Sequence, residues 1–198
     1  GQPAANLVEW LQERSSPFPR FILSDLFPNR ATLELSQGQN PEAIGVHPHP
    51  VDATAVAQDL SHDARMMVNA FHHFDTDHAR AILEDCAAKE KSIFIFEGTP
   101  RGWKGLLTLG LSIPAVPLAL LLNPFLAPRR NLLKFIFTYL CPIIPLAFMW
   151  DSVITNWRTY SQSELNDLTK SIPHYRWTYH EVPFGQGARA VAFFGAPE

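Results

Sequence analysis

The stretch RMMVNAFHHF, residues 65–74, decides the fold of this chain. It has the pattern of an apolar strand that ends in a small polar residue, Asn69, and a pair of histidines, His72 and His73. Residues 75–89 follow with the spacing of an amphipathic helix, capped by Thr76 or Asp77, and residues 92–97 have the pattern of a second buried strand. This order predicts a β-α-β unit. Its polar residues lie at the carboxyl end of the first strand, the edge at which open α/β sheets bind ligands.

Length and composition narrow the class of protein. The chain has 198 residues, enough for one domain, and a formal net charge of −3. No clustered Lys and Arg face is evident, so we expect no nucleic-acid partner. Cys86 and Cys141 have no partner at metal-ligand spacing, which is typical of reduced thiols in a cytosolic protein. The amino terminus has no basic region followed by an apolar core, so no signal peptide is expected. We therefore expect a cytoplasmic protein.

The elements on either side of this unit extend the α/β pattern. Residues 3–14 are expected to form an amphipathic helix, and residues 21–25 a buried strand that ends in the acid Asp25. Residues 43–46 are a brief strand candidate. Near the other end, Ser161 and Glu164 fit a capping box that opens a helix. Residues 175–182 and 188–194 alternate as strands around a short turn, which predicts an antiparallel pair at the end of the chain.

An apolar insertion interrupts this pattern over residues 101–160. Residues 105–127 form an uncharged run of roughly 23 residues, long enough to cross a bilayer, and residues 135–150 form a second, shorter run. A membrane-spanning hairpin would carry Arg129, Arg130 and Lys134 to the far side, against the positive-inside preference. Three interpretations stay open: association with a membrane surface through residues 105–150, a soluble lid over an apolar substrate, and packing alone, including an oligomer interface.

The residues and their order together resemble a class I S-adenosylmethionine-dependent methyltransferase. That family has a seven-stranded Rossmann-like sheet whose last two strands form an antiparallel hairpin. In the family, an acid at the end of the second strand holds the ribose, and Asp25, followed by Leu26, matches it. Asp52 and Ala53 match the acid and small residue beside the adenine. Asn69 and Ala70 match the end of the fourth strand, near the methionine part of the cofactor.

The resemblance also implies one of two things: the native chain is longer, or this chain binds the cofactor poorly. The family's first strand and glycine-rich loop would precede Gly1, which matches at most the last glycine of that loop. Without that strand, the sheet loses its centre and the cofactor its main backbone contacts. We expect one α/β domain in three stretches. Residues 1–100 hold the cofactor-binding part, residues 101–160 form the apolar helical insertion, and residues 161–198 complete the domain.

The implied reaction is methyl transfer from S-adenosylmethionine to a small-molecule or lipid-like substrate, without a metal. His72 and His73 are candidate bases, because histidine can take a proton from a hydroxyl or amine near neutral pH. Positioning alone supplies most of the rate in many methyl transfers, so a base is not required. In a continuous strand, one histidine would face the site and the other would pack.

Each remaining candidate site residue could instead have a purely structural role or another surrounding. Asp25 and Asp52 could cap local turns rather than bind cofactor. Glu97 could face substrate or pair with Arg101. Trp157, Arg158 and Tyr160, at the exit of the insertion, suit a substrate pocket or a membrane interface. Two other classes of protein stay open. One is a non-catalytic membrane-associated or scaffolding protein that retains the fold. The other is a dehydrogenase-like nucleotide binder, which fits the closing antiparallel pair less well.

Overall fold

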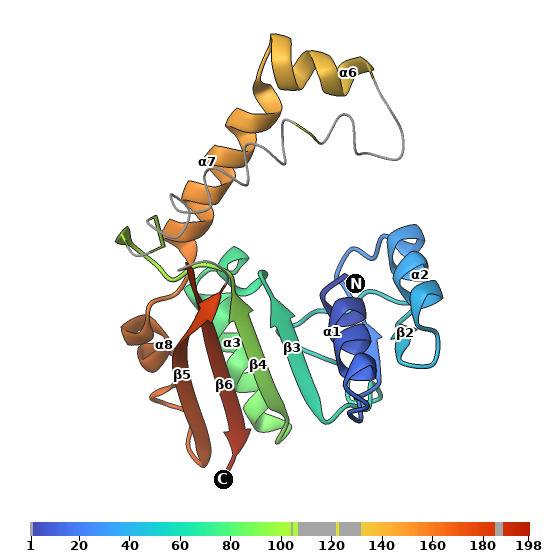
Figure 1. Cartoon of the computed structure of the whole chain (residues 1–198). Helices are drawn as coiled ribbons and strands as arrows, with labels where there is room; N and C mark the ends of the chain where they lie inside the picture. The colour runs from blue at the N-terminus through green and yellow to red at the C-terminus, as the bar shows by residue number, and fades with distance from the viewer. Residues whose placement is uncertain (1, 104, 107–121, 123–131, 185–187) are drawn as a thin grey trace. The chain divides into compact units, whose positions relative to one another are not determined.

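The computed structural model describes residues 2–103, 105–106, 122, 132–184 and 188–198 (Figure 1). Contacts divide the chain into two compact units, Gly1–His62 and Asp63–Glu198. Each unit is described by itself below. Gly1 and nearly all of the first uncharged run of the insertion lie outside the described residues.

Unit 1 is built on a pair of parallel strands. Its elements are α1 (Gln2–Glu13), β1 (Phe21–Leu23), α2 (Arg30–Gln39) and β2 (Ile44–Val46). β1 and β2 are parallel, with Ile22 opposite Gly45. The apolar face of α1 contributes Val8 to a small core that also contains Ile44. The predicted helix and both predicted strands of this part are confirmed.

Unit 2 contains a four-stranded sheet in the order β3-β4-β6-β5. The strands are β3 (Ala64–Val68), β4 (Ser92–Glu97), β5 (Tyr175–Phe184) and β6 (Ala188–Pro197). β3 and β4 are parallel, and β6 is antiparallel to both β4 and β5. β5 therefore runs in the same direction as β3 and β4, and β6 alone is reversed. The predicted β-α-β unit and the predicted antiparallel pair are both confirmed.

The helices of unit 2 follow the expected order. After β3 comes the 3₁₀ turn η1 (Phe71–His73). The helix α3 (Thr76–Ala88) follows (Figure 1), and Ile82 and Leu83 on this helix are buried. After β4, the described part of the insertion comprises α6 (Leu132–Phe135), the π-helical η2 (Ile136–Leu140) and α7 (Ile143–Arg158). The helix α8 (Gln162–Thr169) then leads to β5, and both halves of its predicted capping box, Ser161 and Glu164, are formed.

The strand predicted over residues 65–74 is shorter than expected. It ends at Val68, and the next residue, Asn69, has a φ of 49°, in the left-handed region. Asparagine is one of the few residues that enters this region readily, and doing so breaks the extended backbone. The chain then turns through η1, so the two histidines belong to a tight turn and not to a strand.

The lengths of the described helices bear on the membrane hypothesis for the insertion. Taken singly, none of the helices in the described ranges is both long and apolar enough to cross a bilayer. Leu132–Leu140 and Ile143–Arg158, which meet at a bend of 69°, would be sufficient as a pair by length and composition alone. Association of residues 105–150 with a membrane stays a prediction.

Candidate functional site

Asn69 joins the carboxyl ends of β3 and β4. Its backbone N–H donates to the carbonyl of Phe96 at 2.8 Å, and its Oδ1 accepts the N–H of Gly98 at 2.7 Å. A side chain at position 98 would begin 3.2 Å from that Oδ1, which is tight, so glycine allows this close approach. The two strand ends are thereby fixed next to each other at the edge where the sequence analysis places the site.

Glu97, the last residue of β4, holds the His-His turn from inside the protein. Its carboxylate is buried. Oε1 accepts the backbone N–H groups of Phe71 at 2.8 Å and His72 at 3.2 Å, and Oε2 lies 2.7 Å from Nδ1 of His72. An ionised carboxylate only accepts hydrogen bonds, so Nδ1 of His72 is the donor in this pair, and in the neutral form of the ring Nε2 is the acceptor. The predicted alternative partner, Arg101, contacts Glu164 instead.

Two residues at the exit of the insertion hold the same turn from the other side. The guanidinium of Arg158 donates from Nε to the carbonyl of His72 at 3.1 Å and from Nη2 to that of His73 at 3.0 Å. The hydroxyl of Tyr160 donates to the carbonyl of Phe74 at 3.0 Å, and burial raises the pKa of this phenol. Both side chains therefore fix the turn. Their predicted contact with substrate stays a prediction, as does that of Trp157, which is 57% exposed.

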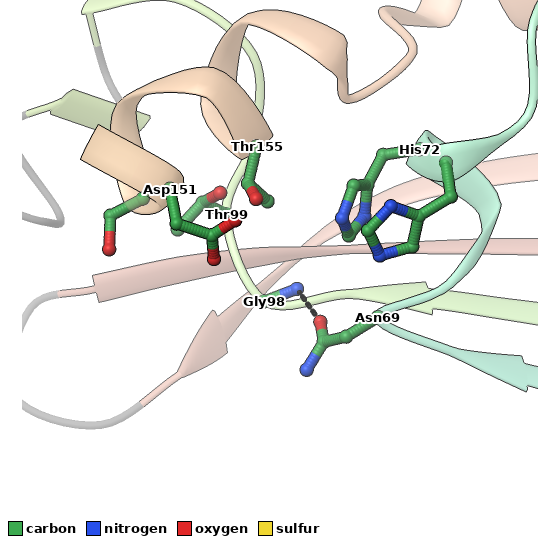
Figure 2. Close-up of a pocket in the computed structure, with 8 residues that line it drawn as sticks. Asn69, His72, Gly98, Thr99, Asp151 and Thr155 are labelled. Carbon is green, nitrogen blue, oxygen red and sulfur yellow. Dashed lines mark hydrogen bonds between the residues drawn. The ribbon is translucent and has the colours of Figure 1, made fainter. Parts of the chain in front are cut away.

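A pocket of about 310 Å³ opens beside this turn (Figure 2). Figure 2 shows its lining side chains, which come from the strand ends, from η1 and from α7: Asn69, His72, His73, Gly98, Thr99, Asp151, Ser152 and Thr155. The continuous strand on which the predicted division between a site-facing and a packed histidine depended is not formed. Both histidines line the pocket, His72 buried and His73 exposed, with ring centroids 4.2 Å apart, because a 3₁₀ turn does not alternate its side chains as a strand does.

His73 differs from His72 in its surroundings. Desolvation by the surrounding protein, followed by the neighbouring His72 ring and the Arg158 guanidinium, lowers the pKa of His73 below its usual value. Glu97 and Asp151 act in the opposite direction but do not outweigh these effects. His73 is therefore neutral at physiological pH and can exchange hydrogen bonds in the pocket without carrying charge.

The sequence analysis did not identify the pocket residues contributed by α7. Asp151, Ser152 and Thr155 lie on this helix. The next residue, Asn156, is fully buried and anchors α7: its Nδ2 donates to the carbonyl of Pro100 at 2.8 Å, and its Oδ1 accepts the N–H of Gly102 at 3.3 Å. A usable signal was present, since these polar residues interrupt an apolar run at helical spacing.

Asp25 and Asp52, the predicted cofactor acids, are neighbours at one end of the parallel pair of unit 1. The N–H of Val51 donates to the carbonyl of Asp25 at 2.9 Å, which brings Asp52 beside it. Each carboxylate also accepts a backbone N–H two residues further on, from Phe27 at 2.9 Å and Thr54 at 2.8 Å. The turn-capping alternative is thus realised, and cofactor contact by these residues, and by Leu26 and Ala53, stays a prediction.

The order of strands and the polar edge define the class of fold. A parallel sheet closed by one reversed strand, with β6 between β4 and β5, and with polar side chains at the carboxyl ends of β3 and β4, is the arrangement of class I S-adenosylmethionine-dependent methyltransferases.

Solved structures of other proteins have a similar fold. LepI, solved in complex with SAM, is similar with a TM-score of 0.53 and 12% identity, over 96% of this chain and 39% of its own. A putative O-methyltransferase from Nostoc punctiforme has a TM-score of 0.52 and 14% identity, over 96% and 48%. The chain thus spans less than half the length of these two proteins. No protein-family model matches the chain, and no curated protein does.

A protein of another described activity is equally similar. A putative Zn-dependent alcohol dehydrogenase from Rhodobacter sphaeroides has a TM-score of 0.54 and 13% identity, over 100% of this chain and 82% of its own. At such identities the likeness shows the fold alone. The choice of reaction therefore depends on the residues of the site.

Proposed function

We propose that this chain forms part of an S-adenosylmethionine-dependent methyltransferase that acts on a small-molecule or lipid-like acceptor. The observation that supports this most directly is the buried Glu97–His72 pair beside a pocket at the carboxyl edge of the sheet. In the proposed reaction this pair orients Nε2 of His72 as the proton acceptor, a role that a purely structural turn would not require. The nearest alternative, a dehydrogenase, gains no comparable support from the residues that line this pocket.

The residues present are compatible with the cofactor. Ribose hydroxyls are donors, and an ionised carboxylate offers about four acceptor positions. The bond that Oδ1 of Asp25 accepts from Phe27 therefore leaves this carboxylate with capacity for a ribose. When bound, S-adenosylmethionine would supply a methyl group already activated on a positively charged sulfur, and adenosylhomocysteine would be released.

The side chains of the pocket would position the acceptor and take its proton. An acceptor O–H or N–H in the pocket would donate a hydrogen bond to Nε2 of His72. On methylation of the acceptor, its proton would pass to Nε2 of His72. Glu97 would stabilise the resulting imidazolium through Nδ1–H, at 2.7 Å. Such proton transfer contributes about 10²–10⁴-fold to a rate.

Calorimetric titration of the full-length native protein with S-adenosylmethionine tests the proposal. We expect binding that Asp25→Asn weakens by about tenfold or more, because a hydrogen bond to a charged acceptor contributes about 1.5–3 kcal/mol. Glu34→Gln removes an exposed acid from α2 of the same unit and serves as the matched control. Absence of detectable binding to the full-length protein would overturn the proposed function.

A further inference from the structure

Each described side chain that lines the pocket carries a polar group. These groups are two imidazoles, an amide, a carboxylate and three hydroxyls. Removing such groups from water without giving them hydrogen-bond partners is unfavourable. The part of a substrate that enters this pocket is therefore polar, and the apolar or lipid-like substrate expected from the sequence would need a polar group at this end.

The same face of α7 becomes apolar away from the pocket. Residues three or four apart share one face of a helix, so Phe148 and Ile144 lie in line with Ser152. The hydroxyl of Ser152 donates to the carbonyl of Phe148 at 2.8 Å, one turn earlier. Phe148 and Ile144 are 41% and 36% exposed. We call these two residues the pocket-side stripe. From Ser152 to Ile144 the helix rises about 12 Å, roughly the length of a ten-carbon chain.

The opposite face of α7 also carries exposed apolar residues, which can be compared with the pocket-side stripe. Leu146 and Trp150 are also strongly exposed, at 61% and 70%, but they lie about half a turn away from the pocket-lining residues. A ligand that reaches the pocket along α7 would contact the pocket-side stripe and not these residues. A bilayer or a second protein coating the helix would contact both faces.

We propose that the acceptor is an amphipathic molecule with a hydroxyl- or amine-bearing head in the pocket and an apolar body along the pocket-side stripe. This deepens the proposed function and rests on it. Asp151 adds selectivity, because its carboxylate lines the pocket and repels an anionic head. The acceptor head is therefore neutral or cationic, and the apolar body adds affinity in proportion to the length of it that lies against Phe148 and Ile144.

A homologous series of 1-alkanols, from butanol to decanol, tests this on the full chain. Binding is followed through the ring resonances of His72 and His73 by NMR, below the solubility limit of each alcohol. We expect the dissociation constant to fall by about twofold per methylene, half of the factor for full burial, up to about ten carbons. An alkylamine should bind at least as well as the alcohol of equal length, and an alkylcarboxylate about tenfold more weakly.

Matched variants decide where the alkyl chain lies. Phe148→Ser and Ile144→Ser should flatten the chain-length dependence, and Leu146→Ser, the same kind of change on the opposite face, should preserve it. All three positions are exposed, and circular dichroism checks that the variants fold. A flat series in the wild-type chain, equal binding of the carboxylate, or equal flattening by Leu146→Ser would each overturn the inference.

The titration needs no cofactor, so it is separate from the test of the proposed function. If S-adenosylmethionine fails to bind the full-length protein while the chain-length dependence persists, methyl transfer is refuted and the amphiphile site alone is supported. If the cofactor binds and the series is flat, the substrate class is refuted and methyl transfer stands.

Discussion

The substitution Glu97→Gln replaces one carboxylate oxygen by an amide group and keeps the shape of the side chain. In the wild-type chain, Oε1 accepts the N–H groups of Phe71 at 2.8 Å and His72 at 3.2 Å, and Oε2 accepts Nδ1–H of His72 at 2.7 Å. The glutamine oxygen can keep both backbone donors, so only the bond to the imidazole changes. A hydrogen bond to a charged group contributes about 1.5–3 kcal/mol and a neutral one about 0.5–1.5 kcal/mol, so we expect the free energy of unfolding to fall by the difference, about 1–1.5 kcal/mol, with the fold retained.

The larger consequence concerns the proton on the imidazole ring. The new amide group faces Nδ1 of His72 and can only donate, so Nδ1 becomes the acceptor and Nε2 carries the proton. The histidine then presents a donor to the pocket and no longer a proton acceptor. Because general base catalysis contributes about 10²–10⁴-fold, methyl transfer to a hydroxyl acceptor should slow by about two to four orders of magnitude.

The tautomer can be measured without knowing the substrate. Two-bond ¹H–¹⁵N correlation spectra distinguish Nδ1–H from Nε2–H rings, and His72→Gln assigns the signal. We expect Nδ1–H in the wild-type chain and Nε2–H in Glu97→Gln. Glu164→Gln, which removes a carboxylate from the contact with Arg101 in the same unit, should leave the tautomer unchanged. An Nε2–H ring in the wild-type chain, or no change in Glu97→Gln, would refute the reasoning.

Three further outcomes follow from contacts within unit 2. Burial raises the pKa of Asp85, but hydrogen bonds from its basic neighbours, Lys89 first, outweigh it, so the folded-state pKa is lowered. Its stabilisation is therefore present above about pH 4 and lost as the pH falls through the folded-state pKa; urea denaturation should show the deficit of Asp85→Asn shrinking towards pH 3. Asn156→Ala leaves the carbonyl of Pro100 without its donor, and thermal denaturation should show a loss of about 1–3 kcal/mol. Arg158→Ala frees two carbonyls of the His-His turn, and hydrogen exchange should quicken across residues 71–74 while α8 stays protected.

Local signals in the sequence were sufficient for most of the regular structure. The capping box at Ser161 and Glu164 is formed in both directions, because its two partners lie within one helical turn. The antiparallel pair at the end of the chain also follows from local alternation. The cap of α3 was predicted one or two residues too late: Asp75, rather than Thr76 or Asp77, accepts the N–H of His78. Helix ends depend on side-chain geometry that spacing alone does not specify.

The turn after β3 was the main error, and its cause is a single backbone angle. A strand through Phe74 would place His72 and His73 on opposite faces, whereas the left-handed Asn69 ends the strand and η1 brings both rings to the pocket. Asparagine before an apolar residue is a weak turn signal. Apolar residues lie on both sides of Asn69 and favour a continuous strand, so the prediction followed them and not the turn signal.

The sequence predicts that Glu97 is buried, but it does not predict which groups donate hydrogen bonds to its carboxylate. Residues 92–97 alternate, and Ile93, Ile95 and Glu97 share the buried face of β4. Because every second residue of a strand shares one face, the sequence predicts that the carboxylate of Glu97 lies on an apolar face. A buried carboxylate requires hydrogen-bond donors. Their identity depends on register: with Val68 opposite Phe96, the turn after β3 lies over the end of β4. A shift of one residue would turn Glu97 to the other face and leave His72 without its partner. The oriented base is therefore a consequence of strand register, which is set by the whole sheet and not by the residues that carry the chemistry.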